Sequence, residues 1–373
     1  MKAINSFILE RLNAREATDS LRSLKTENSL VDFCSNDYLG FARSAELKRL
    51  FERELEKYPA YKLGSTGSRL LAGNDQFAED LEARIAEFHN VECSLLFNSG
   101  YDANVGIFSC LPQRGDTIIC DEYIHASIID GVRLSHASRF VFKHNDLDSL
   151  EQKLKASQGR IFIAVESIYS MDGDEAPLPQ ICGLAEQFNA AVIVDEAHAI
   201  GVFGDQGRGL VDKLNLNSKV FARIVTFGKA LGVHGAAILC GNELRSYLIN
   251  FARSFIYTTA PSITTNLAIK IAYDYLNSKN HQQDLHRKIQ SFKSNLQGIG
   301  SLAESRSGIQ ILLIPGNTVA RSLAFNLQQS GFDIRPILSP TVQPGSERLR
   351  ICIHNHNSIS EIETLCNTIK HFL

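Results

Sequence analysis

The chain has 373 residues, of which 44% are apolar and 21% are charged, and its formal net charge is −3. These values are typical of a globular protein with a sizeable core, built as two domains or as one large domain with a smaller one. Because the charge is near zero and no long run of lysine or arginine occurs, the composition argues against proteins that bind nucleic acid or anionic membranes.

The eight cysteines are scattered along the chain and include no Cys-x-x-Cys pair. In a chain of this length, that spacing indicates reduced thiols and predicts neither a disulfide framework nor a metal site. The first ten residues lack a basic region followed by an apolar run, and no stretch reaches the length of a membrane span. We therefore expect a cytoplasmic protein without metal, nucleic acid or membrane partners.

The first sixty residues are predicted to contain two helices joined by an extended segment. Apolar residues interleaved with arginines and acids over residues 6–25 indicate an amphipathic helix that lies on the body of the protein. An extended piece at 30–34 leads into the polar, turn-forming run Ser35-Asn36-Asp37-Tyr38-Leu39-Gly40. A second helix is predicted from Ser44, its N-cap, to Tyr58.

Two loops rich in small residues come next. Gly64–Arg69 has the composition of a loop that approaches a ligand, although such loops are common, and a helix is predicted over Asn74–His89. A strand over Cys93–Phe97 then ends at the small-residue turn Asn98-Ser99-Gly100-Tyr101, which leads into a helix. Such a turn gathers free backbone N–H groups and favours a phosphate, but it is also the form of an ordinary strand-to-helix connection.

From residue 117 to residue 194, predicted strands and helices alternate. The strands are apolar throughout, as in a sheet that is covered on both faces. They are Thr117–Cys120, Arg139–Phe142, Ile161–Glu166 and Ala190–Val194, and the helices between them are Ala126–Leu134, Leu147–Ala156 and Leu178–Phe188. This order predicts an α/β fold with a largely parallel sheet.

The second half of the chain is predicted to complete this large domain and to add a small one. An apolar run over Val220–Phe227 predicts a strand that ends at Gly228-Lys229. After further helices, a polar stretch near residue 278 marks the boundary, and the remainder is an α+β pattern. We therefore divide the chain into an N-terminal segment (1–40), a large domain (41–278) and a small C-terminal domain (279–373).

Ionisable residues follow several of the predicted strands, at the edge where ligands bind in parallel sheets. Asp195 directly follows a buried strand, and a buried carboxylate is unfavourable unless it meets a positive partner. Lys229 lies among apolar and small residues, which lower the pKa of an amine and let it attack carbonyl carbon. Each residue alone also fits an ordinary role: Asp195 in a salt bridge, Lys229 in a solvated loop and His198 in the core.

One ligand accounts for these groups together, namely a pyridine aldehyde that carries a phosphate. Lys229 would hold the aldehyde as an imine, Asp195 would pair with the ring nitrogen, and His125 would lie over the ring. The turn at Gly100-Tyr101 would receive the phosphate. A protonated ring accepts the electrons left when a bond to an amino acid Cα breaks. We therefore predict that the chain binds pyridoxal 5'-phosphate.

Seven motifs in the chain resemble, in order, those of the α-oxoamine synthases, which are fold-type I pyridoxal phosphate enzymes. The likeness covers nearly the whole chain, and seven ordered motifs are far more specific than any one of them. They are Ser35–Gly40, Asn98–Tyr101, Asp121-Glu122 with His125–Ser127, Glu166 with Ser170–Asp174, Asp195–His198, Thr226–Lys229 and Arg348–Arg350. The resemblance implies a large cofactor-binding domain with a mostly parallel mixed sheet and a smaller α+β domain.

The resemblance also implies roles for single residues. Lys229 is similar to the family's Schiff-base lysine and proton acceptor, Asp195 to the partner of the ring nitrogen, and His198 to the group on the ring hydroxyl. By the same resemblance, His125 is the stacking histidine. Matched positions that contact the cofactor are Gly100, Tyr101, Ser170 and Thr226, and those that bind the amino acid or acyl intermediate are Arg22, Asn36 and Arg350. Arg348 shares the strand face of Arg350, so either arginine could meet the substrate carboxylate.

The reaction implied by the resemblance is the condensation of an amino acid with an acyl thioester and loss of carbon dioxide. Within the family, the chain most resembles the members that join L-alanine to a pimeloyl thioester, of coenzyme A or acyl carrier protein, in biotin synthesis. Such enzymes are homodimers, and the segment Tyr257–Ala260 could reach the phosphate of the partner. Three alternatives stay open: a sister enzyme for glycine or serine with acetyl, succinyl or palmitoyl thioesters, an aminotransferase, and a catalytically silent scaffold.

Overall fold

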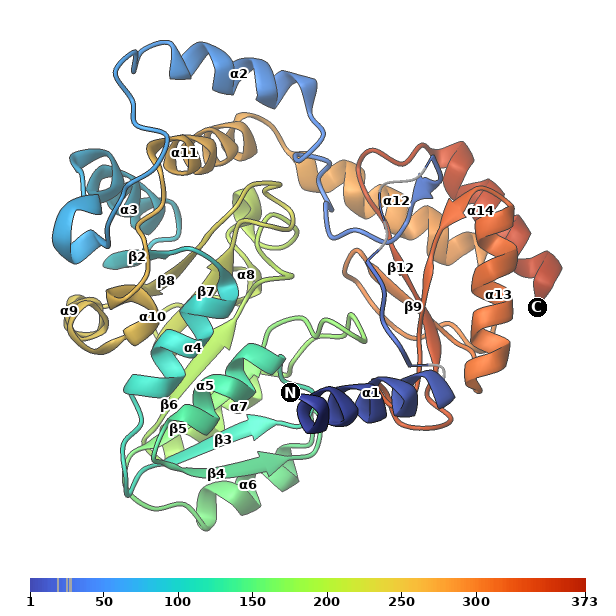
Figure 1. The fold of residues 1–373 in the computed structure, drawn as a ribbon, viewed down its shortest axis with the longest axis horizontal. Coiled ribbons are helices and arrows are strands. Elements are labelled where there is room, and N and C mark those ends of the chain that lie inside the picture. Colours follow the sequence, from blue (N-terminus) through green and yellow to red (C-terminus); the bar gives the residue numbers. More distant parts are fainter. Residues whose placement is uncertain (19, 25, 27–28) are drawn as a thin grey trace.

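The computed structural model describes residues 1–18, 20–24, 26 and 29–373. Its main feature is a seven-stranded sheet in the order β2-β8-β7-β6-β5-β3-β4 (Figure 1). β8 runs antiparallel to both of its neighbours, and the remaining strands run parallel to one another. The strands are β2 (Cys93–Phe97), β3 (Thr117–Asp121), β4 (Ser138–Phe142), β5 (Ile161–Glu166), β6 (Ala190–Asp195), β7 (Ala222–Thr226) and β8 (Ala236–Cys240). The predicted α/β fold with a largely parallel sheet is confirmed.

Helices cover both faces of this sheet, which explains why its central strands are apolar throughout. Successive residues of β3 point to opposite faces: Ile118 packs in the core shared with α4 and α5, and Ile119 in the core shared with α3, α6 and α7. The helices are α1 (Lys2–Ala17), α2 (Ala45–Leu55), α3 (Gln76–Phe88), α4 (Gly100–Cys110), α5 (Ala126–Leu134), α6 (Leu147–Lys155), α7 (Leu178–Gln187), α8 (Leu210–Lys213), α9 (Asn242–Phe251), α10 (Arg253–Ile256), α11 (Ile263–Ser278), α12 (His281–Asn295), α13 (Asn317–Gln329) and α14 (Ile359–Phe372), with the short turns η1 (Arg69–Gly73) and η2 (Asp205–Gly207). None of the described helices combines the length and apolar character that crossing a membrane would require.

The C-terminal part has its own small antiparallel sheet, in the order β11-β12-β9 (Figure 1). Its strands are β9 (Ile309–Leu313), β11 (Arg335–Ile337) and β12 (Arg348–Cys352), and α13 and α14 pack beside them. The short strand β1 (Val31–Asp32) pairs in parallel with β10 (Phe332–Asp333), so the extended N-terminal segment lies on the C-terminal part. The proposed division of the chain into domains stays a prediction.

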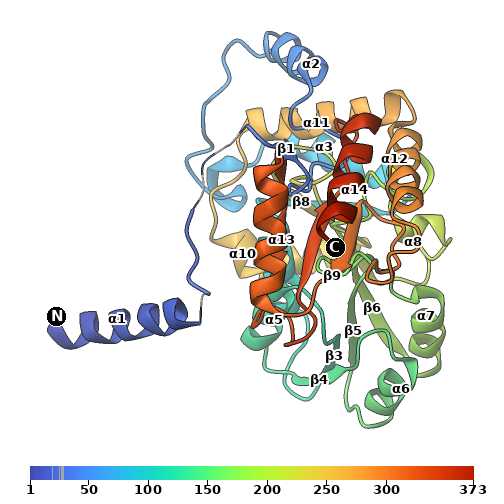
Figure 2. The same ribbon diagram turned by 90° about the vertical axis from the view of Figure 1, so that its right-hand side faces the viewer.

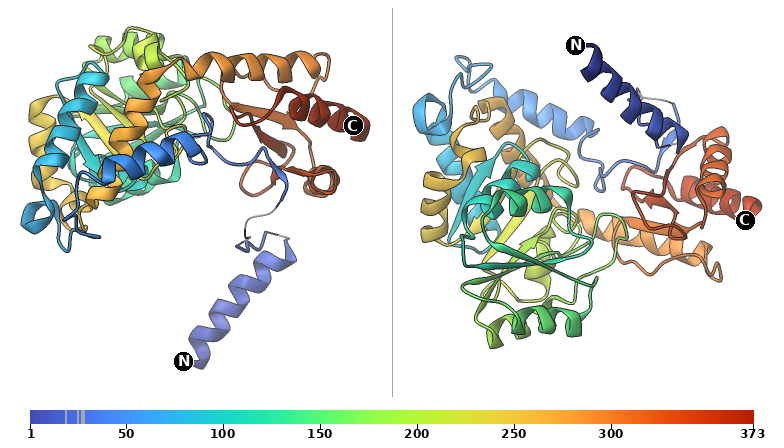
Figure 3. Two further views of the ribbon diagram at one scale, coloured as in Figure 1. Left: turned by 90° about the horizontal axis from the view of Figure 1, so that it is seen from above. Right: turned by 60° about the horizontal axis from the view of Figure 1, so that its bottom comes forward.

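The N-terminal helix α1 stands away from the rest of the chain (Figures 2 and 3). The expectation that it lies on the body is therefore wrong for the single chain. Ile4, Phe7 and Leu9 are 64%, 61% and 58% exposed, because no apolar surface of the same chain faces them. The two hydrophobic cores of the described chain are formed by other elements and include no residue of α1. The apolar residues of a helix alone therefore do not determine what the helix packs against.

Candidate active site

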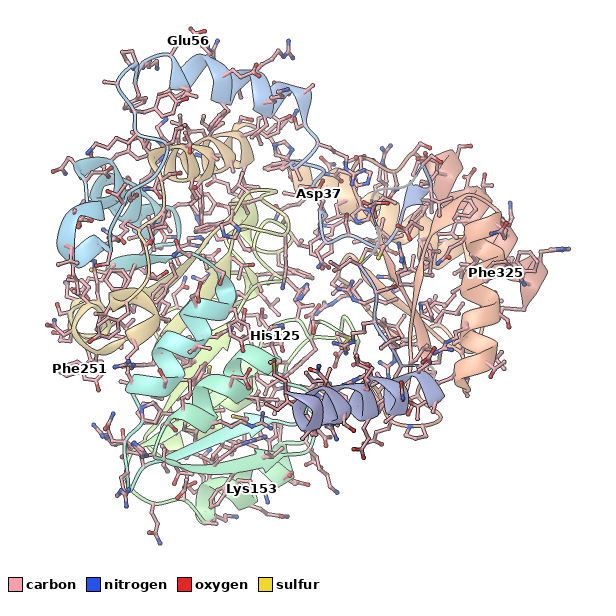
Figure 4. All side chains as sticks on the ribbon, in the orientation of Figure 1. Asp37, Glu56, His125, Lys153, Phe251 and Phe325 are labelled. Atoms are coloured by element: carbon pink, nitrogen blue, oxygen red, sulfur yellow. The ribbon has the colours of Figure 1, made fainter. Side chains whose placement is uncertain are left out.

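A cavity of about 260 Å³ lies at the carboxyl ends of β5, β6 and β7. Figure 4 places His125, at the start of α5, near the middle of the molecule beside this edge of the sheet. The lining residues come from many segments and are Asn36, Ser99, Gly100, Tyr101, Asn104, His125, Ser127, Glu166, Asp195, Ala197, Thr226, Gly228, Lys229, His234 and Gly235. A larger surface hollow of about 760 Å³, between α3 and α11, contains none of these residues.

The sheet itself brings three of the polar groups together. Glu166, Asp195 and Thr226 are the last residues of β5, β6 and β7, which are neighbours in the sheet. Glu166 is the direct parallel partner of Asp195. Since parallel strands end at one edge, a polar residue that terminates each apolar run must lie near its neighbours. The predicted gathering of strand-end residues into one site is what the structure contains.

Lys229 lies close to a histidine ring within this cavity. Its Nζ is 2.7 Å from His198 Nε2. Burial lowers the pKa of Lys229 to about 8, and the nearby Asp195 only partly opposes that effect. An amine with a pKa near 8 is neutral in an appreciable fraction of molecules at neutral pH, and only the neutral form is nucleophilic. Lys229 therefore has the electrostatic setting of an amine that attacks a carbonyl.

Hydrogen bonds with a defined direction run from Lys229 to the polar segment after β1. Burial, followed by the positive charge of Lys229, lowers the pKa of His198 well below its usual range, so its Nε2 can accept from the lysine. His198 Nδ1–H then donates to Tyr38 Oη at 2.7 Å, and the Tyr38 hydroxyl donates to Asn36 Oδ1 at 3.1 Å. Asn36 Oδ1 also accepts from Arg350 at 2.9 Å. This arrangement fixes the ring of His198 and links the C-terminal part to the amine.

Asp195 is held in one orientation by two donors. Its Oδ1 accepts the backbone N–H of Ala197 at 2.9 Å, and its Oδ2 accepts Asn104 Nδ2–H at 2.7 Å. The neighbouring carboxyl of Glu166 is buried, and burial followed by the charge of Asp195 raises its pKa well above the usual range. Burial therefore favours the protonated form of Glu166, while the two donors fix the orientation of the Asp195 carboxyl group, which lines the cavity.

His125 caps the N-terminus of α5. Its Nδ1 accepts the backbone N–H of Ser127 at 3.2 Å and lies 2.7 Å from Ser127 Oγ. Burial lowers the pKa of His125, and the charge of Asp195 only partly opposes this. The ring is thus neutral and held at one edge of the cavity, consistent with a flat group that stacks on another ring.

The N-terminus of α4 forms an anion cradle. Ser99 caps this helix by accepting the N–H of Asp102, and the N–H groups of Gly100 and Tyr101 have no hydrogen-bond partner among the described residues. A Cβ at Gly100 would lie 2.4 Å from Thr226 Cγ2, so only glycine fits here. Free N–H groups at the positive end of a helix favour a phosphate.

The cavity offers the groups that pyridoxal 5'-phosphate needs. Thr226 Oγ1, Glu166 Oε1 and Asn104 Oδ1 are buried and have no partner among the described residues, although buried polar atoms are nearly always paired. An amine, an oriented carboxylate, a neutral ring and an anion cradle surround the same space. These features fit a phosphorylated pyridine aldehyde, the ligand predicted from the sequence.

Most of the residues predicted from the sequence meet in this cavity. The residues that line it are Asn36, Gly100, Tyr101, His125, Asp195, Thr226 and Lys229. His198 is not part of the lining but contacts the amine of Lys229. Ser170 does not line the cavity. Its contact with Arg350 is made by its backbone, whose carbonyl accepts Arg350 Nε–H at 2.7 Å. Arg22 lies instead on a separate cavity of about 720 Å³ with residues of the stretch 336–341. The roles of Ser170 and Arg22 stay predictions.

The two candidate arginines differ in their partners. Arg348 forms an ion pair with Asp172 and donates to the carbonyl of Met171 at 3.3 Å. Arg350 donates to Ser170 O and Asn36 Oδ1, and no carboxylate among the described residues pairs with it. A guanidinium without an acidic partner keeps its charge available for a ligand. Arg350 is therefore the better placed of the two to meet a substrate carboxylate.

The segment Tyr257–Ala260 is held against its own chain close to the anion cradle. Asn98 Nδ2 donates to Thr258 Oγ1 and to the carbonyl of Thr259, both at 2.9 Å. The backbone N–H of Ala260 donates to the carbonyl of Gly67 at 2.9 Å, and Tyr257 is 72% exposed. The expectation that this segment reaches a partner subunit stays a prediction.

Several residues of the site were not assigned roles from the sequence. Tyr38, Ser127 and Glu166 belong to segments singled out there, whereas Asn104 lies three residues beyond one of them. Glu166 ends an apolar strand as Asp195 does, and this shared position could have predicted that Glu166 lies at the site. Tyr38 and Asn104 meet their partners only through the fold.

Comparisons with known proteins give matches over nearly the whole chain. The family model described as aminotransferase class I and II matches residues 28–369. A protein of Emericella nidulans named 8-amino-7-oxononanoate synthase is 42% identical, across 100% of this chain and 96% of its own length. The aminoacyl transferase sphA of Byssochlamys spectabilis is 34% identical, across 98% of this chain and 86% of its own. The crystal structure of 8-amino-7-oxononanoate synthase from Francisella tularensis is 29% identical with a TM-score of 0.79, and the match covers 92% of this chain and 98% of that one.

Proposed function

We propose that this chain, which belongs to the α-oxoamine synthase branch of the class I and II aminotransferases, condenses L-alanine with a pimeloyl thioester. The products are 8-amino-7-oxononanoate, carbon dioxide and a free thiol, and the step belongs to biotin biosynthesis. The cofactor is pyridoxal 5'-phosphate. The observation that carries the proposal is the Lys229 amine, which has a lowered pKa and lies 2.7 Å from His198 in the same cavity as Asp195.

Lys229 is the proton-transfer residue of this proposal. When bound, pyridoxal phosphate supplies an electron sink for the pair of electrons left at the Cα of alanine. Lys229 Nζ, once neutral, accepts the Cα proton and later returns a proton to the same carbon. His198 Nε2 accepts a hydrogen bond from the amine and keeps it oriented. His198 is buried and Lys229 is partly buried, which limits the access of water that would compete for the proton.

Substrate binding is assigned to the groups around Asn36. Arg350 and Asn36 lie next to each other, and the guanidinium has no acidic partner among the described residues. Arg350 therefore binds the carboxylate of alanine or of the β-keto acid, and Asn36 orients the guanidinium. Asp195 holds the ring nitrogen of the cofactor, Gly100 and Tyr101 hold its phosphate, and His125 stacks on its ring.

We further propose that the active form is a homodimer. Ile4, Phe7 and Ile8 share one face of α1, and all three are exposed in the single chain because no described part of it covers them. Such exposed apolar surface on a protein of ordinary composition marks an interaction site. A second copy of the chain is the partner that accounts for it.

A second candidate is a sister enzyme with a different amino acid or acyl chain. It is favoured by the 34% identity to an aminoacyl transferase, which lies close to the values for the synthases. The cofactor-binding residues are expected to be the same in both cases, so the site as described does not separate them. The amino acid and the length and polarity of the thioester that the enzyme accepts distinguish the two candidates.

The test pairs alanine, glycine or serine with pimeloyl, acetyl, succinyl or palmitoyl thioesters and identifies the products by mass spectrometry. Alanine with the pimeloyl thioester should give 8-amino-7-oxononanoate and outperform every other pair, and the Lys229→Ala variant should give none. Parallel assays with coenzyme A and with acyl carrier protein as the thiol carrier identify the donor. If glycine or serine outperforms alanine, the sister enzyme replaces the proposal. Formation of pyruvate and pyridoxamine phosphate from alanine alone indicates an aminotransferase, and no product together with no cofactor binding indicates a scaffold.

A further inference from the structure

Asn104, on α4, contacts two residues of the site at once. Its Nδ2 donates to Asp195 Oδ2 at 2.7 Å and to Ser127 Oγ at 3.0 Å. Asn104 and Ser127 are 2% and 0% exposed, so both hydrogen bonds are shielded from water. Ser127 Oγ in turn lies 2.7 Å from Nδ1 of His125. One buried amide thus connects the carboxylate on one side of the cavity with the histidine on another.

The direction of every hydrogen bond in this series follows from the carboxylate. A carboxylate only accepts, so the amide must turn its NH₂ group, and not its oxygen, toward Asp195. The second hydrogen of the same NH₂ group then goes to Ser127 Oγ, which therefore accepts. The serine hydroxyl keeps its own proton to donate to His125 Nδ1. Turning the amide over would place its oxygen against the Asp195 carboxylate, which cannot donate, and would lose that bond.

His125 is left with a single tautomer. Its Nδ1 accepts from the Ser127 hydroxyl and also from the Ser127 backbone N–H at 3.2 Å. A ring nitrogen that accepts two hydrogen bonds carries no proton, so the proton of the neutral ring is on Nε2. No hydrogen bond to Nε2 occurs among the described residues, and His125 lines the cavity. The ring therefore offers the cavity a donor and not a base.

We propose that Asn104 is a positioning residue that aims the Asp195 carboxylate at the ring nitrogen of the cofactor and, through Ser127, fixes His125 as the neutral Nε2–H tautomer. In this arrangement His125 stacks on the cofactor and donates a hydrogen bond to the substrate, and proton removal is left to Lys229. The consequence for catalysis rests on the proposed function, whereas the tautomer does not.

A feature of Asn104 itself supports this assignment. Its Oδ1 is buried without a partner among the described residues, which destabilises the folded protein. An apolar residue of similar size would avoid that penalty, so the NH₂ group has to supply something that an apolar residue cannot. Asn266, on α11, is also 2% exposed with an unpartnered Oδ1, but it does not line the cavity. Asn266 is therefore a matched control for the effect of burial alone.

The first experiment reads the tautomer in the cofactor-free protein. Protein labelled with ¹⁵N in histidine is compared with the variants Asn104→Leu, Ser127→Ala and Asn266→Leu, and the His125 signals are identified by their loss in His125→Gln. The parent and Asn266→Leu should show a protonated Nε2 and an unprotonated Nδ1. Asn104→Leu and Ser127→Ala should show a mixture of tautomers or a protonated Nδ1. A parent with its proton on Nδ1, or a parent tautomer unchanged in both site variants, overturns the proposal.

The second experiment uses the enzyme loaded with pyridoxal phosphate. In Asn104→Leu, kcat should fall roughly 10- to 100-fold, the range found when groups that orient a ligand are removed, and KM should change less. The pH titration of the cofactor's visible absorption should shift in Asn104→Leu and stay unchanged in Asn266→Leu. Melting temperatures of both variants show whether a change in activity reflects a loss of folded protein. Ser127→Thr, which keeps the hydroxyl, should retain more activity than Ser127→Ala. Equal effects in Asn104→Leu and Asn266→Leu contradict the proposal, whereas a parent that makes no 8-amino-7-oxononanoate contradicts the proposed function and leaves the tautomer result standing.

Discussion

At the scale of single residues, the reactivity of Lys229 should follow from its pKa. Burial lowers that pKa to about 8, against an ordinary lysine value near 10.5. Because only the neutral amine attacks an aldehyde, covalent capture of pyridoxal phosphate by the cofactor-free protein should accelerate as the pH rises and level off above about pH 8. Stopped-flow absorbance between pH 6 and 10 measures this rate. Lys229→Ala should show no covalent phase, and a rate that keeps rising to pH 10 would mean that the amine is ordinary.

The two arginines of β12 should respond differently to substitution. Arg350→Leu removes the guanidinium that lacks an acidic partner, so KM for alanine should rise by roughly 10- to 100-fold, as for the loss of about 1.5–3 kcal/mol from a charged hydrogen bond. Arg348→Leu breaks the ion pair with Asp172, so it should lower the melting temperature more than it raises KM. Steady-state kinetics and thermal melting of both variants check this. The opposite pattern would assign the substrate carboxylate to Arg348.

Residue types at strand ends could be predicted from the sequence, but their partners could not. Asp195 and Lys229 were visible because each follows an apolar run that must be a buried strand. Tyr38 and His198 are separated by 160 positions, and their hydrogen bond exists only because the segment after β1 folds back over the sheet. No local pattern encodes that contact, and the same holds for Asn104 and Asp195.

At the scale of elements, His144 joins the end of β4 to the loop that follows β5. Its Nδ1 and Nε2 lie 2.9 Å from Asp121 Oδ1 and 2.8 Å from Asp174 Oδ2. Burial alone lowers the pKa of His144, but hydrogen bonds and charges from Asp121 and Asp174 outweigh it and raise the pKa to about 10. The same loop carries Ser170, whose carbonyl accepts from Arg350. His144 therefore holds in place the backbone that contacts Arg350, the arginine proposed to bind the substrate.

This raised pKa makes a definite contribution to the pH dependence of stability. Because the folded-state pKa is about 10 and the unfolded value is about 6.5, the stabilisation is fully present below pH 6.5 and is lost as the pH rises through 10. His144→Gln should lower the free energy of unfolding by about 3 kcal/mol at pH 6, a typical value for breaking a buried ion pair, and by clearly less at pH 10.5. Denaturant unfolding of the variant and of His371→Gln, at an exposed position, measures the difference. A loss that is equal at both pH values would show that the ring acts by packing alone.

Element positions followed from the sequence where one physical signal dominated. The limits of β2, β5 and α5 were predicted at both ends, because apolar runs and caps coincide there. After β8, Ala252 has ψ of 100° and separates α9 from α10, although no glycine or proline marks this break in the sequence. The short strands β10 and β11 were missed because two or three residues carry no periodicity.

At the scale of the whole molecule, the sequence could predict how much apolar surface α1 carries but not what covers it. Helical periodicity predicts that one face of a helix is apolar, but it does not show whether the surface that covers this face belongs to the same chain. The extended segment 30–34 shows the same limit, because it pairs with β10, some three hundred residues later. No short-range pattern in the sequence predicts that pairing. Contacts between distant segments are settled by the packing of the complete fold.

The exposed face of α1 gives the last prediction, which tests the proposed homodimer. Ile4→Asp combined with Phe7→Asp replaces two apolar side chains that share one face of the helix and are 64% and 61% exposed in the single chain. Burying each such side chain contributes about 1.5–3 kcal/mol, and a two-fold dimer contains each position twice, so the dissociation constant should rise by at least roughly 100-fold. Sedimentation equilibrium over a range of concentrations measures it. Asn13→Asp, on the opposite side of the same helix, is the control and should leave association within about tenfold of the parent, because an exposed charge contributes little. A double variant that associates as tightly as the control would show that α1 does not contact the second subunit, and the apolar face would then need another partner.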